Sequence, residues 1–219
     1  MIAAIDGPAG VGKSTIARTC AEHSGFLYVN SGSFYRAVTL AVLEREVAPD
    51  DSPAVLAVAR SCRIELRDGE VWLDGRGVES LLHGDAVDAG VAALSAIPEV
   101  RDIVNARLRA IVGNRDAVVE GRDIGTVVFP DARLKIFLDA DIATRASRRH
   151  EQGVSGLSLD ELQAAIGARD SADRNKPTGR LAAALDALQI DTSHLTIQQV
   201  CERVDEAILV SRNNPGDIR

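Results

Sequence analysis

Aromatic residues are scarce in this sequence: Phe, Trp and Tyr make up 3% of its 219 residues. Its core must therefore be built mostly from Ala, Val, Leu and Ile, and the 46% hydrophobic content suits one compact domain. No run of about 18 apolar residues exists, so we expect no membrane span and no membrane partner. The chain also reaches Asp6 too early for a secretory signal peptide, so no targeting segment is expected.

Cysteine and basic charge are limited as well. Cys20, Cys62 and Cys201 are far apart and odd in number, without metal-ligand spacing, and they predict reduced thiols in a cytoplasmic protein. The net charge is −7, whereas a nucleic-acid-binding domain usually carries a basic face. We therefore expect no nucleic-acid partner, although local groups of arginines could still bind phosphates.

The sequence does contain an alternation of strand and helix. Short apolar runs predict buried parallel strands, and apolar residues at helical spacing predict the helices between them. This order indicates an α/β fold with a five-stranded parallel sheet and helices on both faces. The predicted strands cover residues 2–5, 26–29, 117–119, 134–138 and 188–190; the predicted helices cover residues 14–22, 33–45, 98–112, 142–150, 159–169 and 197–209.

Two segments interrupt this order. Residues 61–92 contain two β-like runs on either side of Asp68-Gly69, a hairpin turn signal, and predict a small antiparallel insertion. A helical stretch over residues 85–96 follows the hairpin. Residues 170–181 are polar and include Pro and Gly, so we predict a mobile loop there.

The most specific signal follows the first predicted strand. Residues 7–14 match G-x-x-x-x-G-K-[ST] in full and open a predicted helix. The glycines let backbone N–H groups turn inward around an anion, and the helix N-terminus adds its dipole. Lys13 can reach the β- and γ-phosphates, and Ser14 can bind Mg²⁺ through its hydroxyl. The residues predicted to bind ATP here are Gly7, Pro8, Ala9, Gly10, Val11, Gly12, Lys13, Ser14 and Thr15.

A phosphate loop alone leaves the class of enzyme open. The nearest match to the guanine-binding N-K-x-D motif of GTPases is Asn175-Lys176-Pro177-Thr178, which ends in Thr and lacks the carboxylate. A transporter-type L-S-G-G-Q signature is not found in the sequence. A short chain with many isolated arginines favours a small-molecule kinase, in which arginines bind two sets of phosphates.

Four further motifs follow along the chain: Ser31-Gly32-Ser33-Phe34-Tyr35-Arg36, Pro98-Glu99-Val100-Arg101, the run from Glu120-Gly121-Arg122-Asp123 to Ala132, and Arg169-Asp170-Ser171-Ala172-Asp173. These motifs resemble those of the bacterial cytidylate kinases, and the resemblance extends from Ile5 to about Val200. It implies a P-loop NTPase fold that transfers a phosphoryl group from ATP to CMP or dCMP, giving ADP and CDP or dCDP.

The resemblance also implies roles for individual residues. Arg122 would hold the CMP phosphate, and Asp123 would accept a hydrogen bond from the cytosine amino group, which uracil cannot donate. Lys13, Arg122 and Arg169 are the expected catalytic residues. The implied CMP-binding residues are Ser31, Tyr35, Arg36, Arg101, Gly121, Arg122, Asp123, Arg169, Asp173 and Lys176.

The same resemblance divides the single kinase domain into three parts. The expected core covers residues 1–60, 93–148 and 182–212, the CMP-binding insertion about 61–92, and the lid about 149–181. Arg145 and Arg149 share one helix face at the start of this lid and would contact ATP.

Some alternatives stay open at this point. The candidate arginines could lie on solvated helix faces, and Asp123 could form a strand-end ion pair. Ala92 and Lys176 depart from the family pattern, which has a Ser and an Arg there. The acceptor could be UMP or a non-nucleotide alcohol, and a nucleotide-binding regulator without turnover is a third hypothesis. We expect a monomer.

Overall fold

The computed structural model describes residues 1–151, 156–176 and 178–213. The chain forms two compact units. Unit 1 comprises Met1–Tyr28 with Asn114–Arg219, and unit 2 comprises Val29–Gly113. The lid expected over residues 149–181 includes 152–155 and 177, which lie outside the described residues. Among the described residues, none of the helices is long and apolar enough to cross a membrane.

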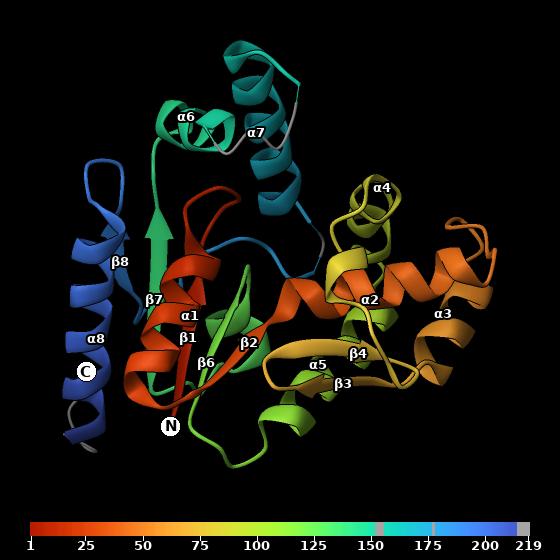
Figure 1. Ribbon diagram of the computed structural model, residues 1–219, viewed down its shortest axis with the longest axis horizontal. Coiled ribbons are helices and arrows are strands. Elements are labelled where there is room, and N and C mark those ends of the chain that lie inside the picture. Colours follow the sequence, from red (N-terminus) through yellow and green to blue (C-terminus); the bar gives the residue numbers. More distant parts are fainter. Residues whose placement is uncertain (152–155, 177, 214–219) are drawn as a thin grey trace. The chain divides into compact units, whose positions relative to one another are not determined.

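The larger sheet has the strand order β2-β6-β1-β7-β8 (Figure 1). β1 pairs in parallel with β6 and β7, and β7 pairs in parallel with β8. The predicted five-stranded parallel sheet is confirmed. The residues of the central strands are buried, which explains why they read as uninterrupted apolar runs. The strands are β1 (Ile2–Asp6), β2 (Leu27–Asn30), β6 (Ala117–Gly121), β7 (Leu134–Asp139) and β8 (Leu188–Asp191).

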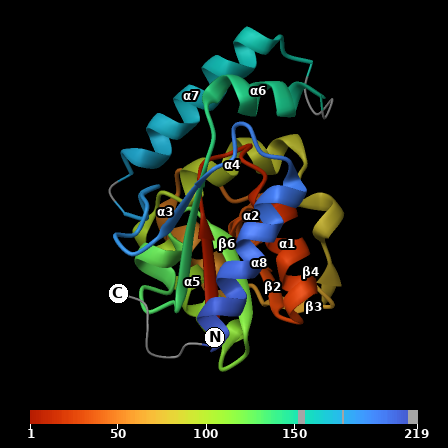
Figure 2. The same cartoon turned by 90° about the vertical axis from the view of Figure 1, so that its left-hand side faces the viewer.

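Two helices of unit 1 lie side by side, as Figure 2 shows: α1 (Lys13–Ser24) and α8 (Ile197–Asn213). Cys20 on α1 and Cys201 on α8 are buried in their common core. α1 ends where Gly25 adopts a left-handed φ of 69°, a conformation that glycine takes without strain. The sequence predicted both helices, although α8 extends further than the apolar spacing indicated.

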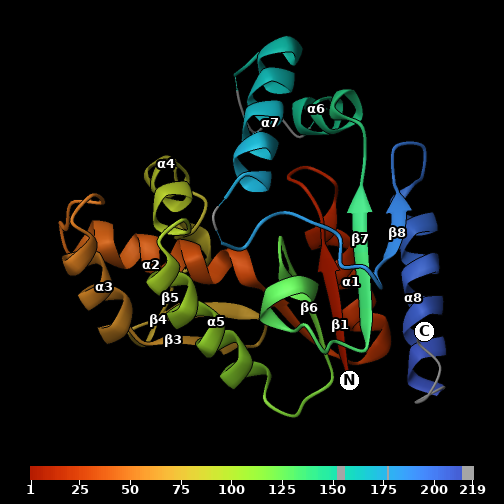
Figure 3. The ribbon, with the colours of Figure 1, turned by 180° about the vertical axis from the view of Figure 1, so that it is seen from behind.

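Two more helices of unit 1 follow the carboxyl end of β7 (Figure 3): α6 (Ile142–Glu151) and α7 (Leu159–Arg174). They pack through a small apolar cluster of Ala146, Leu162 and Ile166. The mobile loop predicted from residue 170 is wrong at its start, because α7 continues through Arg174. The polar residues that suggested a loop include Asp170 and Asp173, which are both buried against cationic partners.

Unit 2 contains the predicted hairpin. β3 (Ile64–Arg67) and β4 (Glu70–Leu73) pair antiparallel, and Asp68 and Gly69 between them have positive φ angles, as a tight type I′ turn requires. The short β5 (Arg76–Gly77) extends this sheet. The helical elements of the unit are α2 (Ser31–Glu44), α3 (Ser52–Ser61), η1 (Glu79–Leu81), α4 (Asp85–Leu94) and α5 (Pro98–Val112).

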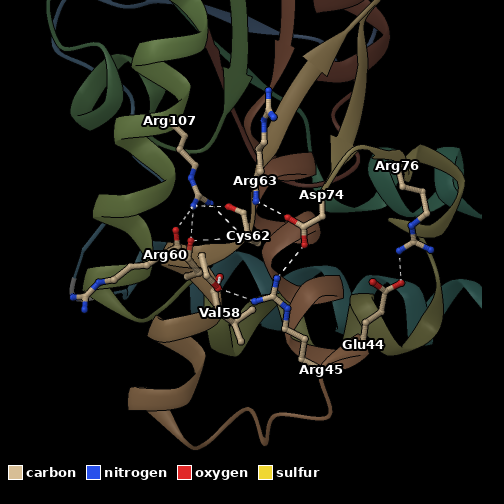
Figure 4. Close-up of polar contacts among 11 residues, drawn as sticks. Glu44, Arg45, Val58, Arg60, Cys62, Arg63, Asp74, Arg76 and Arg107 are labelled. Atoms are coloured by element: carbon tan, nitrogen blue, oxygen red, sulfur yellow. Dashed lines mark hydrogen bonds and ion pairs between the residues drawn. The ribbon is translucent and has the colours of Figure 1, made fainter.

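Arg107 on α5 binds the carboxyl end of α3 (Figure 4). Its Nη2 donates to the carbonyl oxygens of Ala59 at 2.6 Å, Cys62 at 2.8 Å and Arg60 at 3.3 Å. The last carbonyls of a helix have no partner within the helix, so this guanidinium supplies what α3 lacks. Helix α3 was not predicted from the sequence, although Asp51 caps its first turn.

Candidate active site

The phosphate loop joins the end of β1 to the first turn of α1. Gly10 and Gly12 have φ angles of 77° and 90°, which side chains other than that of glycine rarely tolerate. At Gly7 a side chain is excluded by packing, because a Cβ would clash with the carbonyl oxygen of Leu138 in β7. Ser14 is exposed at the start of α1, where a hydroxyl could reach a bound ion.

Lys13 is buried with only 6% of its surface exposed, and its Nζ donates to the carbonyl oxygen of Pro8 at 2.6 Å. Burial lowers the pKa of Lys13 well below its usual value, as do the positive charges of Arg122 and Arg169, while nearby carboxylates oppose the shift. The positive charges of Arg122 and Arg169 thus act on the Lys13 ammonium. A polyphosphate bound among them would relieve this repulsion.

The turn after β6 carries two of the predicted acceptor residues. Arg122 and Asp123 lie here, directly before the π-helical segment η2 (Ile124–Val128). The guanidinium of Arg122 donates from Nη1 to the carbonyl oxygen of Gly7 at 3.1 Å. Asp123 is 4% exposed. The turn lies at the carboxyl ends of the parallel strands, where open α/β sheets bind their ligands.

Asp173 on α7 contacts two other predicted site residues, Arg122 in this turn and Lys176. One carboxylate oxygen accepts from Nε of Arg122 at 3.0 Å, and the other pairs with Nζ of Lys176 at 2.8 Å. Burial raises the pKa of Asp173, but the charges and hydrogen bonds of Arg122 and Lys176 outweigh it, so the pKa lies below its usual value. Arg169, one turn earlier on α7, is exposed.

Arg145 on α6 is 2% exposed and holds three groups. It donates from Nε to the carbonyl oxygen of Ala140 at 3.0 Å and from Nη1 to that of Ala9 at 3.2 Å. Its Nη2 pairs with Asp170 of α7 at 2.6 Å. The guanidinium thus contacts the backbone of the phosphate loop, whereas its contact with ATP itself stays a prediction. Arg149, four residues along α6, is half-buried.

Four predicted acceptor residues belong to unit 2. Ser31, Tyr35 and Arg36 lie on α2, and Arg101 lies on α5. Arg101 is buried, and its guanidinium lies over the Tyr35 ring, 5.4 Å from the ring centroid. Arg36 pairs with Asp88 of α4 at 2.5 Å. A ligand phosphate would have to compete with that carboxylate for the Arg36 guanidinium.

Sequence reasoning missed three buried carboxylates of unit 1. Glu120 on β6 is 3% exposed. Asp6 ends β1 and is 4% exposed, and Asp170 on α7 is 7% exposed. The sequence did contain a signal for Asp6, because it is a charged residue at the end of an apolar strand and directly precedes Gly7. For Asp170 the only signal was its place between Arg169 and Asp173.

Known proteins resemble this chain over nearly its whole length. The profile of a family described as "Cytidylate kinase" matches residues 3–209. The cytidylate kinase of Caldanaerobacter subterraneus subsp. tengcongensis is 41% identical over 218 residues, which cover 98% of this chain and 96% of that protein. The cytidylate kinase of Mycobacterium avium strain 104 is 41% identical over 216 residues, which cover 95% of each chain.

Solved structures with low sequence identity share the fold. An uncharacterized protein from Eubacterium ventriosum has a TM-score of 0.54 and 14% identity, over 96% of this chain and 98% of that chain. TT1252 from Thermus thermophilus has a TM-score of 0.50 and 20% identity, over 96% of each chain. The solved structures show the fold alone, whereas the family match and the two curated relatives show the family: this chain belongs to the cytidylate kinase family.

Proposed function

We propose that this protein transfers the γ-phosphoryl group of ATP to CMP or dCMP, giving ADP and CDP or dCDP. The observation that carries the proposal is a contact between the phosphate loop and the turn after β6, which we call the acceptor turn because it carries Arg122 and Asp123. In this contact Arg122 donates a hydrogen bond to the Gly7 carbonyl. A donor and an acceptor phosphate bound at these two segments would lie next to each other. Membership of the cytidylate kinase family supports the choice of acceptor.

The transfer needs no covalent nucleophile from the protein. An anionic oxygen of the CMP phosphate attacks the γ-phosphorus, and the bond from that phosphorus to the β–γ bridging oxygen breaks, which releases ADP. Lys13, Arg122 and Arg169 would stabilise the charge on the phosphoryl oxygens, since positioning and electrostatics do most of the catalysis in this reaction. The effect of Arg122 and Arg169 on the pKa of Lys13 supports such a shared role.

Mg²⁺ fits the residues present through Ser14, whose exposed hydroxyl opens α1. The described part of the chain holds no group of three or more His, Cys, Asp or Glu side chains that could bind a metal ion. Mg²⁺ keeps several waters and is bound largely through substrate phosphates, so the Ser14 hydroxyl would be one ligand beside phosphate and water oxygens. When bound, the ion would neutralise charge on the β- and γ-phosphates.

For the acceptor, we propose that Asp123 accepts a hydrogen bond from the cytosine amino group and that Arg122 binds the phosphate. Arg169 and Asp173 are proposed to bind the sugar region, and Lys176 is a further proposed CMP-binding residue. Uracil presents an oxygen where cytosine has its amino group, so a buried carboxylate would repel it. Ser31, Tyr35, Arg36 and Arg101 are further proposed CMP-binding residues. We also retain a cytoplasmic monomer as our expectation; the three cysteines are free and buried.

A panel of acceptors tests this proposal. We expect ATP-dependent product formation with CMP and dCMP, at least about tenfold higher in kcat/KM than with UMP or AMP, since one discriminating hydrogen bond to a charged group contributes that much or more. Release of ADP without an acceptor is the control. A tenfold preference for UMP or AMP would contradict the assignment of Asp123, and no turnover with any acceptor would favour a regulator.

A further inference from the structure

Asp6 stands at the end of β1, immediately before the phosphate loop. The proposed binding of ATP and CMP assigns it no role. Its side chain reaches across to the acceptor turn. One carboxylate oxygen accepts the backbone N–H of Ile124 and the other accepts that of Gly125, each at 2.8 Å. These N–H groups directly follow Asp123, the residue proposed to bind the cytosine base.

Gly7, the next residue, contacts the same turn on the other side of Asp123. The Gly7 carbonyl accepts from Arg122, one residue before Asp123. Gly7 itself is packed so closely against Leu138 of β7 that it has no room for a side chain. The dipeptide Asp6-Gly7 thus contacts the turn on both sides of Asp123, and the sheet fixes the dipeptide through the parallel pairing of β1 with β6 and β7.

The residue type at this position matters. Two neighbouring backbone N–H groups need two acceptors, and an ionised carboxylate offers two equivalent oxygens in one plane. Asn would offer one oxygen and would direct an N–H₂ group at the second backbone donor. A buried carboxylate carries a considerable desolvation cost, so an apolar residue would suit this position better if packing were all that counted.

We propose that Asp6 is a positioning residue, which holds Arg122 and Asp123 in the geometry that binds the acceptor and connects that turn to the phosphate loop. The proposal rests on the function proposed above, because it assumes that the turn binds CMP. Asp6 does not touch substrate in this role; it acts through the backbone of residues 124 and 125.

Asp6→Asn tests the proposal by steady-state kinetics and direct ATP binding. Because one backbone donor would lose its acceptor, we expect KM for CMP to rise about tenfold or more, and the ratio of kcat/KM for CMP over UMP to fall by a similar factor. Affinity for a non-hydrolysable ATP analogue, measured by calorimetry, should change less than about threefold, because the phosphate loop keeps its own contacts.

Asp191→Asn is the matched control. Asp191 also ends a strand of the same sheet and accepts two hydrogen bonds, from the backbone N–H and the hydroxyl of Ser193, but it lies on β8 and is exposed. We expect this variant to keep the wild-type KM for CMP. Parallel loss of CMP and ATP affinity in Asp6→Asn, or an unchanged KM for CMP in a folded variant, would overturn the proposal.

A second variant keeps the test possible if Asp6→Asn does not fold. In Gly125→Ala the added Cβ would lie 3.2 Å from the Cγ and Cδ atoms of Lys135 and 3.4 Å from Asp6 Oδ2, so either the Lys135 side chain or the turn must shift by a few tenths of an ångström, while the Asp6 carboxylate is kept. The same selective rise in KM for CMP is expected. If the wild type prefers another acceptor, the proposed function fails, yet both variants should still raise KM for that acceptor selectively.

Discussion

Arg145 and Asp170 form a buried ion pair between α6 and α7, with 2.6 Å between Nη2 and Oδ2. The Arg145 and Asp170 side chains are 3% and 10% exposed. The same guanidinium donates to Ala9 of the phosphate loop, so the pair connects that loop to the helix that carries Arg169 and Asp173. Within the described residues, the other Asp170 oxygen is buried without a hydrogen-bond partner.

Removing one member of this pair should cost more than removing both. Asp170→Ala leaves the Arg145 charge buried without its carboxylate, and we expect unfolding free energy to fall by about 3–5 kcal/mol. The double variant Arg145→Met with Asp170→Leu should recover much of that loss, because apolar side chains need no partner. Urea denaturation measures both. Equal losses in the two variants would contradict a buried pair.

The Asp170 variants should also change α6 and α7 more than the sheet. Native-state hydrogen exchange is expected to rise first in α7, because its ion pair to α6 is lost while the strand pairings stay. Asp160→Ala, at an exposed position on the first turn of the same helix, is the control and should change stability by less than about 0.5 kcal/mol.

The sequence predicted the five strands and most helices because their signals are local. Apolar runs that end in glycine-rich turns mark the parallel strands, and Asp68-Gly69 marks the hairpin without any tertiary information. The helix α7 shows where this reasoning fails. Asp170 and Asp173 weaken helix propensity on their own, yet in the fold their partners are Arg145, Arg122 and Lys176, and this pairing overrides propensity.

The residues of the candidate site also differ in whether local sequence predicts them. A contiguous motif shows Lys13 and Ser14 from spacing alone, whereas Asp6 acquires its contacts with residues 124 and 125 only when β1 lies beside β6. The role of Asn30, by contrast, is local: its side chain accepts the Ser33 N–H and caps α2. Residues that act through distant backbone groups leave little trace in a single sequence.

Asp123→Ala should lower specificity more than stability. We expect kcat/KM for CMP to fall about 10- to 100-fold, with a much smaller loss for UMP, because only the cytosine amino group can donate to this carboxylate. The acceptor panel measures the ratio. Asp131→Ala, an exposed carboxylate from the same sequence run, should leave the ratio unchanged. If UMP and CMP lose activity in equal proportion, Asp123 does not contact the base.

Arg107→Ala should destabilise unit 2. Three carbonyl oxygens at the end of α3 would lose a charged donor, at a cost of about 2–4 kcal/mol. Thermal unfolding followed by circular dichroism would show a lower Tm. Arg60→Ala, at an exposed position on α3 itself, serves as the control and should leave the Tm within about 2 °C. An unchanged Tm in Arg107→Ala would mean that water replaces the guanidinium at no cost.

Lys13→Ala should abolish turnover with every acceptor while leaving the fold intact. The loss in kcat is expected to be at least about 100-fold, since in the proposed function the ammonium would stabilise charge on the transferred phosphoryl group. Stability should stay equal or rise, because the folded protein buries this ammonium near Arg122 and Arg169, which lower its pKa. Arg18→Ala, at an exposed position on the same helix, should keep its activity. Activity close to wild type in Lys13→Ala would contradict the donor site.

The stability of the protein should depend on pH through Asp6. Burial raises the pKa of Asp6 to about 6, against its two backbone donors; Asp123 adds to the rise and Lys13 opposes it. The native state therefore keeps a proton between about pH 4 and 6 that the unfolded chain has released, so this group's contribution to unfolding free energy falls as pH rises through that window, by at most about 3 kcal/mol.

Asp6→Asn cannot titrate, and comparison with the wild type isolates this effect. The difference in unfolding free energy, wild type minus variant, should decrease from pH 4.5 to pH 7 and then stay constant, because the carboxylate is fully ionised above its native pKa. Urea denaturation at several pH values measures it, with Asp191→Asn as the exposed reference. Parallel curves for wild type and Asp6→Asn would show that Asp6 keeps an ordinary pKa, and that its two backbone donors balance its burial.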